Sequence, residues 1–116
     1  MTVSIASITF DTTNPEQLAA WWAERFDAEI TANMDGFFVI VAGGSLPAQL
    51  AFQKVGDPTP GKNKVHLDIQ TDRDLDAEAA AWVAAGATSL GKRNAGDFFW
   101  VTLADPDGNE FCIAGS

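Results

Sequence analysis

Cysteine and histidine are scarce in this chain. One residue of each type occurs among 116 residues. A single cysteine cannot form an internal disulfide, and one histidine without a Cys-x-x-Cys pair excludes a standard structural zinc site. No apolar run is long enough to span a bilayer, and the start of the chain, MTVSIASITFDTT, lacks the basic segment of a signal peptide. We therefore expect a cytoplasmic protein.

Basic residues are also few. Seven Lys and Arg stand against sixteen Asp and Glu, which gives a net charge of −9 and an isoelectric point near 4.2. Such a charge repels phosphate backbones and anionic lipid surfaces. The composition thus predicts no nucleic-acid partner and no membrane partner.

Apolar residues make up 47% of the chain, which is enough for one core of ordinary size. The first half begins with a predicted strand around Val3 to Phe10. A helix follows, because Asn14 can cap it and Pro15 suits its first position. Its buried face is predicted from the spacing of Leu18, Trp21, Trp22 and Phe26, and three strands are predicted at 29–32, 36–43 and 48–55.

The second half repeats this order after a linker at about 57–63, which is rich in Pro and Gly. A strand is predicted at 65–71, a helix from the acidic start at 72–76 to Gly86, and strands at 88–91, 96–104 and 109–115. The local sequence also repeats, since DGFFVIVA (35–42) is similar to GDFFWVTLA (96–104). The predicted fold is α+β, with tandem βαβββ modules at about 1–56 and 64–116 forming a single domain over 1–116. The modules should form a curved, cup-shaped mixed sheet with the helices outside.

Three stretches resemble the vicinal oxygen chelate superfamily, which includes glyoxalases, bleomycin resistance proteins and extradiol dioxygenases. They are KVHLDIQT (64–71), GAT (86–88) and WVTLADPDGNEFCI (100–113). The chain looks like a short glyoxalase-like protein of that superfamily. The resemblance implies paired βαβββ modules, a homodimer and a pocket inside the curved sheets. It does not imply one activity, because the superfamily holds lyases, isomerases, dioxygenases and binding proteins.

Catalytic members of the superfamily hold a divalent metal with four side chains. The resemblance places these positions at Ser7, Ala51, His66 and Cys112. Imidazole and carboxylate are the usual donors in such sites, and alanine has none. We therefore expect no metal cofactor if this alignment holds. A shift at Ala51 would bring in Gln49 or Gln53, neither of which is a strong ligand.

Strand alternation sorts the side chains onto two faces. In VHLDIQT, Val65, Leu67 and Ile69 should face the helix, and the polar residues should face the concavity. The predicted ligand pocket then consists of Ser7, Thr9, Phe38, Gln53, His66, Asp68, Trp100, Thr102 and Cys112. Aromatic walls with a few polar groups are typical of a small-molecule site.

Several of these residues suit more than one role. His66 is the candidate general base or polar anchor, but His66 and Asp68 would also suit a solvated face with local hydrogen bonds. Trp100 suits ligand stacking or plain core packing. Cys112 suits a buried, inert position, the pocket wall or, third, a nucleophile.

Three classes of function follow. The first is a metal-free binding protein for a small, partly aromatic metabolite or drug. The second is an enzyme: a metal-dependent lyase, isomerase or dioxygenase with an atypical or dimer-completed site, or a metal-free catalyst that uses His66. An interaction module without a small ligand comes last, because it leaves the polar inner residues without a role.

Overall fold

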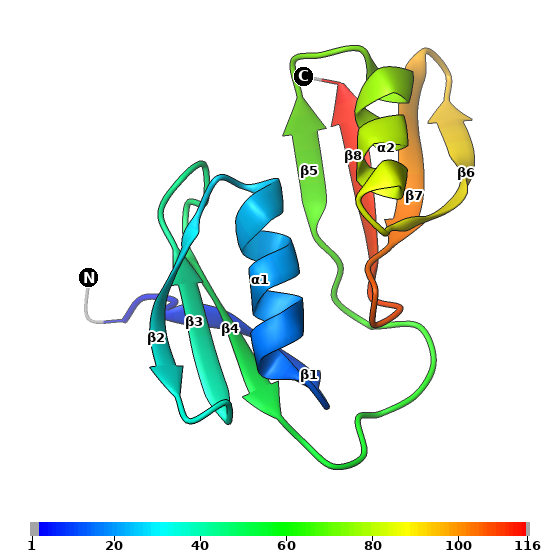
Figure 1. Ribbon diagram of the computed structural model, residues 1–116. Helices are drawn as coiled ribbons and strands as arrows, with labels where there is room; N and C mark the ends of the chain where they lie inside the picture. Colours follow the sequence, from blue (N-terminus) through cyan, green and yellow to red (C-terminus); the bar gives the residue numbers. More distant parts are fainter. Residues whose placement is uncertain (1–2, 116) are drawn as a thin grey trace. The chain divides into compact units, whose positions relative to one another are not determined.

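The computed structural model describes residues 3–115 and divides the chain into two compact units, with the boundary between Thr59 and Pro60. Each unit contains a strand, a helix and three further strands in that order (Figure 1). The elements of the first unit are β1 (Ser7–Thr12), α1 (Pro15–Arg25), β2 (Glu29–Met34), β3 (Phe38–Ala42) and β4 (Gln49–Lys54). Those of the second unit are β5 (Asp68–Thr71), α2 (Leu75–Ala84), β6 (Thr88–Ala95), β7 (Phe98–Ala104) and β8 (Glu110–Gly115).

Both sheets are four-stranded, mixed and open. Their strand orders are β1-β4-β3-β2 and β5-β8-β7-β6, so the two units share one topology. In each unit the first strand pairs in parallel with the last, and the other pairs are antiparallel. The predicted α+β fold of two βαβββ modules is confirmed.

In the first unit, α1 packs its apolar face on one side of the sheet. Leu18 and Trp22 on this helix are 2% and 0% exposed, and Phe52 below them is 0% exposed. The ring of Trp22 lies 5.8 Å from that of Phe10. Asn14 caps the helix by accepting a hydrogen bond from the Gln17 amide at 3.4 Å. Burial of this helix face removes apolar surface from water and thereby stabilises the first unit.

In the second unit, α2 covers one face of the sheet through Trp82. Its ring lies 5.2 Å from that of Phe111, and its indole N–H donates to Glu78 Oε2 at 2.9 Å. The residues of β7 and β8 that share this buried face are Val101, Leu103, Phe111 and Ile113. Because side chains alternate along a strand, Trp100, Thr102 and Cys112 lie on the opposite face. We call that side of the second sheet the inner face.

The turn between β7 and β8 is held by a buried carboxylate. Asp105 is 3% exposed and accepts hydrogen bonds from the backbone N–H groups of Asp107 and Asn109 at 2.9 and 2.8 Å. It also accepts one from the Asn109 side-chain amide at 2.9 Å. Gly108 completes the turn with φ of +88°, a conformation that glycine adopts without steric cost. The DPDGN sequence thereby sets where β8 begins.

Asn63 ties the segment before β5 to the start of β8. Its amide donates to the carbonyls of Val65 and Glu110 at 2.7 and 2.9 Å, and its Oδ1 accepts from the Glu110 N–H at 2.7 Å. A backbone bond from Cys112 N–H to the Leu67 carbonyl, at 3.0 Å, extends the parallel pairing beyond β5. These bonds fix His66, just before β5, beside the last strand.

Three sequence-based expectations were wrong in detail. Val65 does not face the helix: it lies before β5 and is 77% exposed, because the strand begins only at Asp68. The strand predicted at 88–91 runs on to Ala95, since its pairing with β7 continues past a register shift at Gly91. The first strand starts at Ser7 and includes Asp11 and Thr12, because β4 pairs with it that far.

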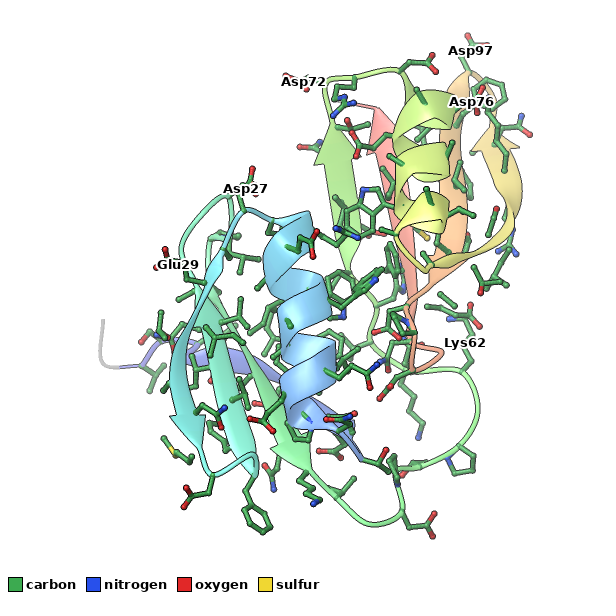
Figure 2. All side chains as sticks on the ribbon, viewed as in Figure 1. Asp27, Glu29, Lys62, Asp72, Asp76 and Asp97 are labelled. Atoms are coloured by element: carbon green, nitrogen blue, oxygen red, sulfur yellow. The ribbon has the colours of Figure 1, made fainter. Side chains whose placement is uncertain are left out.

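The acidic surface follows from exposed carboxylates on turns and helix ends. Figure 2 labels Asp27 and Glu29 in the first unit and Asp72, Asp76 and Asp97 in the second, all of them exposed. Lys92 forms an ion pair with one of them, Asp76, at 3.1 Å. Within residues 3–115 no helix is long and apolar enough to cross a membrane.

Candidate functional site

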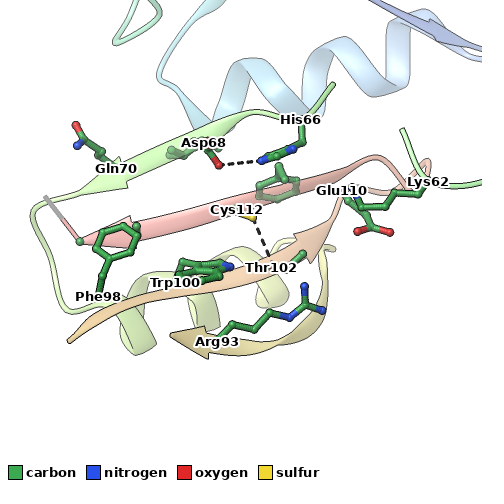
Figure 3. Close-up of a pocket in the computed structure, with 14 residues that line it drawn as sticks. Lys62, His66, Asp68, Gln70, Arg93, Phe98, Trp100, Thr102, Glu110 and Cys112 are labelled. Atoms are coloured by element: carbon green, nitrogen blue, oxygen red, sulfur yellow. Dashed lines mark hydrogen bonds and ion pairs between the residues drawn. The ribbon is translucent and has the colours of Figure 1, made fainter. Parts of the chain in front are cut away.

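A cavity of about 460 Å³ lies on the inner face of the second unit (Figure 3). Its volume is in the range of small-molecule sites. It is lined by strand side chains and by residues that precede β5. They are Lys62, His66, Asp68, Ile69, Gln70, Arg93, Phe98, Trp100, Thr102, Glu110, Phe111, Cys112, Ala114 and Gly115.

The strand register arranges these side chains in two rows across the sheet. One row contains Arg93, Trp100, Ala114 and Gln70, on β6, β7, β8 and β5. The small side chain of Ala114 leaves space between Trp100 and Gln70, so this row forms a floor with taller walls on either side. A flat group that rested on Ala114 would contact the indole at its edge.

The neighbouring row consists of polar and ionisable side chains. It contains Thr102, Cys112 and Asp68, on β7, β8 and β5. Thr102 is 4% exposed, and its hydroxyl lies 3.5 Å from Cys112 Sγ. The cavity therefore has an aromatic row beside a row of hydroxyl, thiol and carboxylate groups.

The aromatic end also carries hydrogen-bond donors that have no acceptor. The rings of Phe98 and Trp100 lie 5.8 Å apart. Among the described residues, the Trp100 indole N–H donates to no acceptor, and Arg93 on the neighbouring strand forms no ion pair. Lys62, which lies near Glu110 at the opposite end of the cavity from Phe98 (Figure 3), forms no ion pair within the described residues either. These groups are available to a ligand that brings oxygen acceptors or negative charge.

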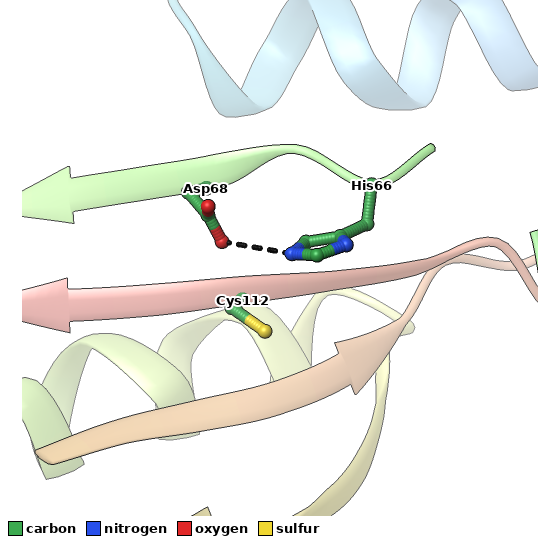
Figure 4. A group of neighbouring side chains, drawn as sticks. All are labelled: His66, Asp68 and Cys112. Carbon is green, nitrogen blue, oxygen red and sulfur yellow. Dashed lines mark ion pairs between the residues drawn. The ribbon is translucent and has the colours of Figure 1, made fainter. Parts of the chain in front are cut away.

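At the other end, three different donor side chains converge (Figure 4). His66 Nε2 lies 3.2 Å from Asp68 Oδ1, and one donor atom from each of His66, Asp68 and Cys112 lies within 4.8 Å of the others. The side chains of His66 and Asp68 are 42% and 78% exposed, so solvent or a ligand reaches them. We call these three residues the donor cluster. Chemically it offers hydrogen bonds, proton transfer through imidazole, or metal ligation.

The four positions that the resemblance predicts for metal ligands offer different donors in the two units. Thr9 pairs with Ala51 in the first sheet as Asp68 pairs with Cys112 in the second, so Ala51 and Cys112 occupy equivalent places. Ser7 precedes Thr9 by two residues, as His66 precedes Asp68. Ala51 is 0% exposed and offers no donor, whereas the second unit offers imidazole and thiol at its two positions and the Asp68 carboxylate beside them. The first unit therefore does not fit a metal ion, and the second does.

Of the residues predicted for the pocket, His66, Asp68, Trp100, Thr102 and Cys112 line the cavity. The other four lie in the first sheet and are not among its lining residues; they are Ser7, Thr9, Phe38 and Gln53. Whether either set binds a ligand stays a prediction.

Sequence reasoning missed Arg93 and Phe98 as lining residues. Arg93 was missed because the strand was predicted to end at residue 91, whereas β6 continues to Ala95. The register places Arg93 directly opposite Trp100. The length of the strand predicted at 96–104 could have indicated this, because its pairing partner must extend along most of that length.

Comparison with known proteins identifies the family. A family model described as glyoxalase-like domain matches residues 7–114. The chain therefore belongs to the glyoxalase-like family within the vicinal oxygen chelate proteins. No curated protein sequence matches the chain significantly.

Solved structures with the same fold are distant in sequence. A glyoxalase/bleomycin resistance protein/dioxygenase family enzyme from Burkholderia phytofirmans PsJN superposes with a TM-score of 0.80 at 19% identity, over 97% of this chain and 98% of the other. The fosfomycin resistance protein FosX from Listeria monocytogenes has a TM-score of 0.78 at 16% identity, over 100% and 95%. Lactoylglutathione lyase from Agrobacterium tumefaciens has a TM-score of 0.69 at 13% identity, over 97% and 93%. At these identities the likeness shows the fold alone.

A point mutant of FosX was solved with Mn(II) and 1S,2S-dihydroxypropylphosphonic acid; it has a TM-score of 0.79 at 17% identity, over 100% of this chain and 93% of the other. Structures with this fold thus include one that contains a divalent metal and a small anionic molecule. The chemistry of the present chain depends on its own residues.

Proposed function

We propose that this protein binds a small, partly aromatic molecule on the inner face of its second unit. The observation that carries the proposal is the cavity beside Trp100, whose floor at Ala114 is left open by a small side chain. Burying a planar ring against an indole is favourable both through apolar area and through ring contact. This binding uses side chains already present and requires no metal ion.

The charges in the cavity narrow the class of ligand. The net charge of −9 suits a cationic compound at long range, but the cavity itself contains Arg93 and Lys62 without ion-pair partners among the described residues. Two carboxylates also line the cavity: Asp68 contacts His66, and Glu110 lies at the start of β8, four residues before the Ala114 floor. Short-range contacts decide specificity, so the proposed ligand carries a carboxylate or another anionic group that Arg93 can bind.

A panel of small aromatic carboxylates, each matched with its neutral primary amide, tests this proposal. Binding would be followed by shifts of backbone amide NMR signals and quantified by calorimetry. We expect at least one carboxylate to move the signals of Gln70, Trp100 and Ala114, and to bind more tightly than its amide. A panel without any binder, or shifts confined to other surfaces, would contradict the proposal.

Two substitutions on β7 make the test specific. Trp100→Ala should weaken binding by about 10-fold, because a ring contact and its buried area contribute more than about 1 kcal/mol. Phe99→Ala is the matched control, since Phe99 is the next residue, is 45% exposed and does not line the cavity. Ala114→Leu should abolish binding by filling the floor. Equal affinities in the Trp100 and Phe99 variants would remove Trp100 from the site.

The homodimer and the enzymatic alternative stay predictions. Light scattering on the purified chain tests the first. For the second, loss of turnover in His66→Ala, on any substrate found among glyoxalase-type and dioxygenase-type reactions, would support a role for His66 as general base or metal ligand. Retained turnover would exclude it.

A further inference from the structure

The donor cluster has the geometry of a partly formed metal site. Typical zinc bond lengths are about 2.0–2.1 Å to His nitrogen, 2.0–2.2 Å to carboxylate oxygen and 2.3 Å to Cys sulfur, so tetrahedral ligands lie about 3.3–3.6 Å apart. His66 Nε2 and Asp68 Oδ1 are 3.2 Å apart, which already matches one such edge. All three donor atoms lie within 4.8 Å of one another. Closing the remaining edges requires movements of only about 1 Å at side-chain ends.

We propose that His66, Asp68 and Cys112 form a binding site for Zn²⁺ or a similar thiolate-binding cation that lies entirely within the second unit. The resemblance to the superfamily predicts no metal, because His66 is the only imidazole or carboxylate donor at its four ligand positions. Asp68 is not one of those four positions. It supplies the third ligand from the same unit and makes donors from the first unit unnecessary.

Stability alone does not account for the cluster. The His66–Asp68 pair is substantially exposed, and exposed ion pairs contribute little to folding. Cys112 is only partly buried, so its thiol is accessible to an ion. Three different metal-ligating groups around one accessible point therefore offer a cation a set of ligands at little cost to the fold.

The ligand types determine which cation is preferred. Thiolate ligands favour Zn²⁺, whereas carboxylate, carbonyl and water ligands suit Mg²⁺ and Mn²⁺. The Thr102 hydroxyl, 3.5 Å from Cys112 Sγ, can donate a hydrogen bond to the thiolate and orient it. This chain should thus select Zn²⁺ over Mn²⁺, the ion present in the FosX complex.

A tetrahedral ion held by three protein ligands would keep a fourth position for water or another ligand. His66, Asp68 and Cys112 line the same cavity as Trp100, so a molecule bound in that cavity could supply this fourth ligand. An open position is typical of zinc sites that bind a water molecule or a ligand rather than purely structural ones. The proposed ion would lie beside the proposed ligand, but neither proposal requires the other.

Calorimetric titration of the purified chain with Zn²⁺, and with Mn²⁺ in parallel, tests the site. We expect one equivalent of Zn²⁺ to bind with micromolar or tighter affinity and Mn²⁺ to bind much more weakly. Titration with Co²⁺ adds a direct signature, because a Co²⁺–thiolate bond produces charge-transfer absorption. Absence of saturable Zn²⁺ binding, or a Co²⁺ complex without that absorption, would overturn the proposal.

Conservative variants assign the ligands. Cys112→Ser should lose the charge-transfer absorption, and Asp68→Asn should weaken Zn²⁺ binding by more than about 10-fold, since losing even an indirect partner of a metal ligand costs about 10–100-fold. Ser7→Ala tests the first unit, and Glu110→Gln is the matched control because its carboxylate lines the same cavity outside the cluster. Both should retain wild-type affinity. Loss of affinity in Ser7→Ala equal to that in Asp68→Asn would refute a site within one unit.

Thiol chemistry provides a second measurement that does not depend on the variants. Cys112 is the only cysteine, so alkylation by iodoacetamide reports on it alone. Bound Zn²⁺ should slow this alkylation, and Trp100→Ala should leave that protection intact while it weakens binding of the aromatic ligand. Failure of the metal site and failure of the ligand site are thereby distinguishable. Equal alkylation rates with and without saturating Zn²⁺ would exclude Cys112 as a ligand.

Discussion

Replacing Asp105 by alanine should lower the free energy of unfolding of the second unit by about 3 kcal/mol. The carboxylate is 3% exposed and accepts three hydrogen bonds of 2.8 to 2.9 Å, two from backbone N–H groups and one from the Asn109 amide. A hydrogen bond to a charged group contributes about 1.5–3 kcal/mol, so a plain sum gives about 5–9 kcal/mol. That sum is an upper limit, because the turn can open and expose its N–H groups to water.

Urea unfolding, followed by tryptophan fluorescence and far-UV circular dichroism, measures the effect. Asp105→Asn should cost less than alanine, because its carbonyl oxygen can still accept the two backbone bonds while its amide faces the Asn109 donor. Asp97→Asn is the matched control: Asp97 lies in the β6–β7 turn, is exposed, and should change stability by less than about 0.5 kcal/mol. An alanine variant within 1 kcal/mol of wild type would refute the view that this carboxylate holds the start of β8.

Two further changes test local structure. Gly44→Ala should destabilise the first unit by more than about 3 kcal/mol, because φ is +56° and a Cβ would meet the Phe26 carbonyl oxygen at 2.2 Å, whereas Gly43→Ala, with φ of +92° and open space around it, should cost only about 1–2 kcal/mol. Thermal unfolding of the two variants compares them, and equal losses would contradict the contact. Asp74→Ala should cost about 1 kcal/mol, because its side chain caps α2 by accepting from the Ala77 N–H at 2.9 Å; a urea midpoint equal to wild type would show that the cap is dispensable.

The fold could be predicted from the sequence because the same pattern of strands and helix occurs in both halves of the chain. The similar local sequences and the repeated order of strands and helix predicted one topology for both halves, and the two sheets do have equivalent strand orders. Boundaries were less accurate because they depend on partners. The strand predicted to end at residue 91 continues to Ala95 because β7 pairs along that length, and this pairing cannot be read from the local sequence.

The candidate site was partly predictable for the same reason. Alternation along VHLDIQT predicted that His66 and Asp68 share a face, and the structure places both on the cavity lining. Their approach to Cys112 depends on the parallel register of β5 and β8. That register is fixed by the bonds of Asn63 to the start of β8, which join residues 47 apart in sequence. No period in the sequence encodes such a contact.

The two units differ in chemistry although they share a topology. The row equivalent to Asp68, Cys112 and Thr102 contains Thr9, Ala51 and Ile40 in the first unit, with Ala51 fully buried. None of these three is a strong metal donor, and none is ionised at neutral pH. A repeated fold therefore leaves one copy free to keep a structural role while the other carries the polar site. It follows that ligand binding and metal binding should both tolerate changes in the row of Thr9, Ala51 and Ile40. Changes at Trp100 should weaken binding of the aromatic ligand, and changes in the donor cluster should weaken binding of the metal ion.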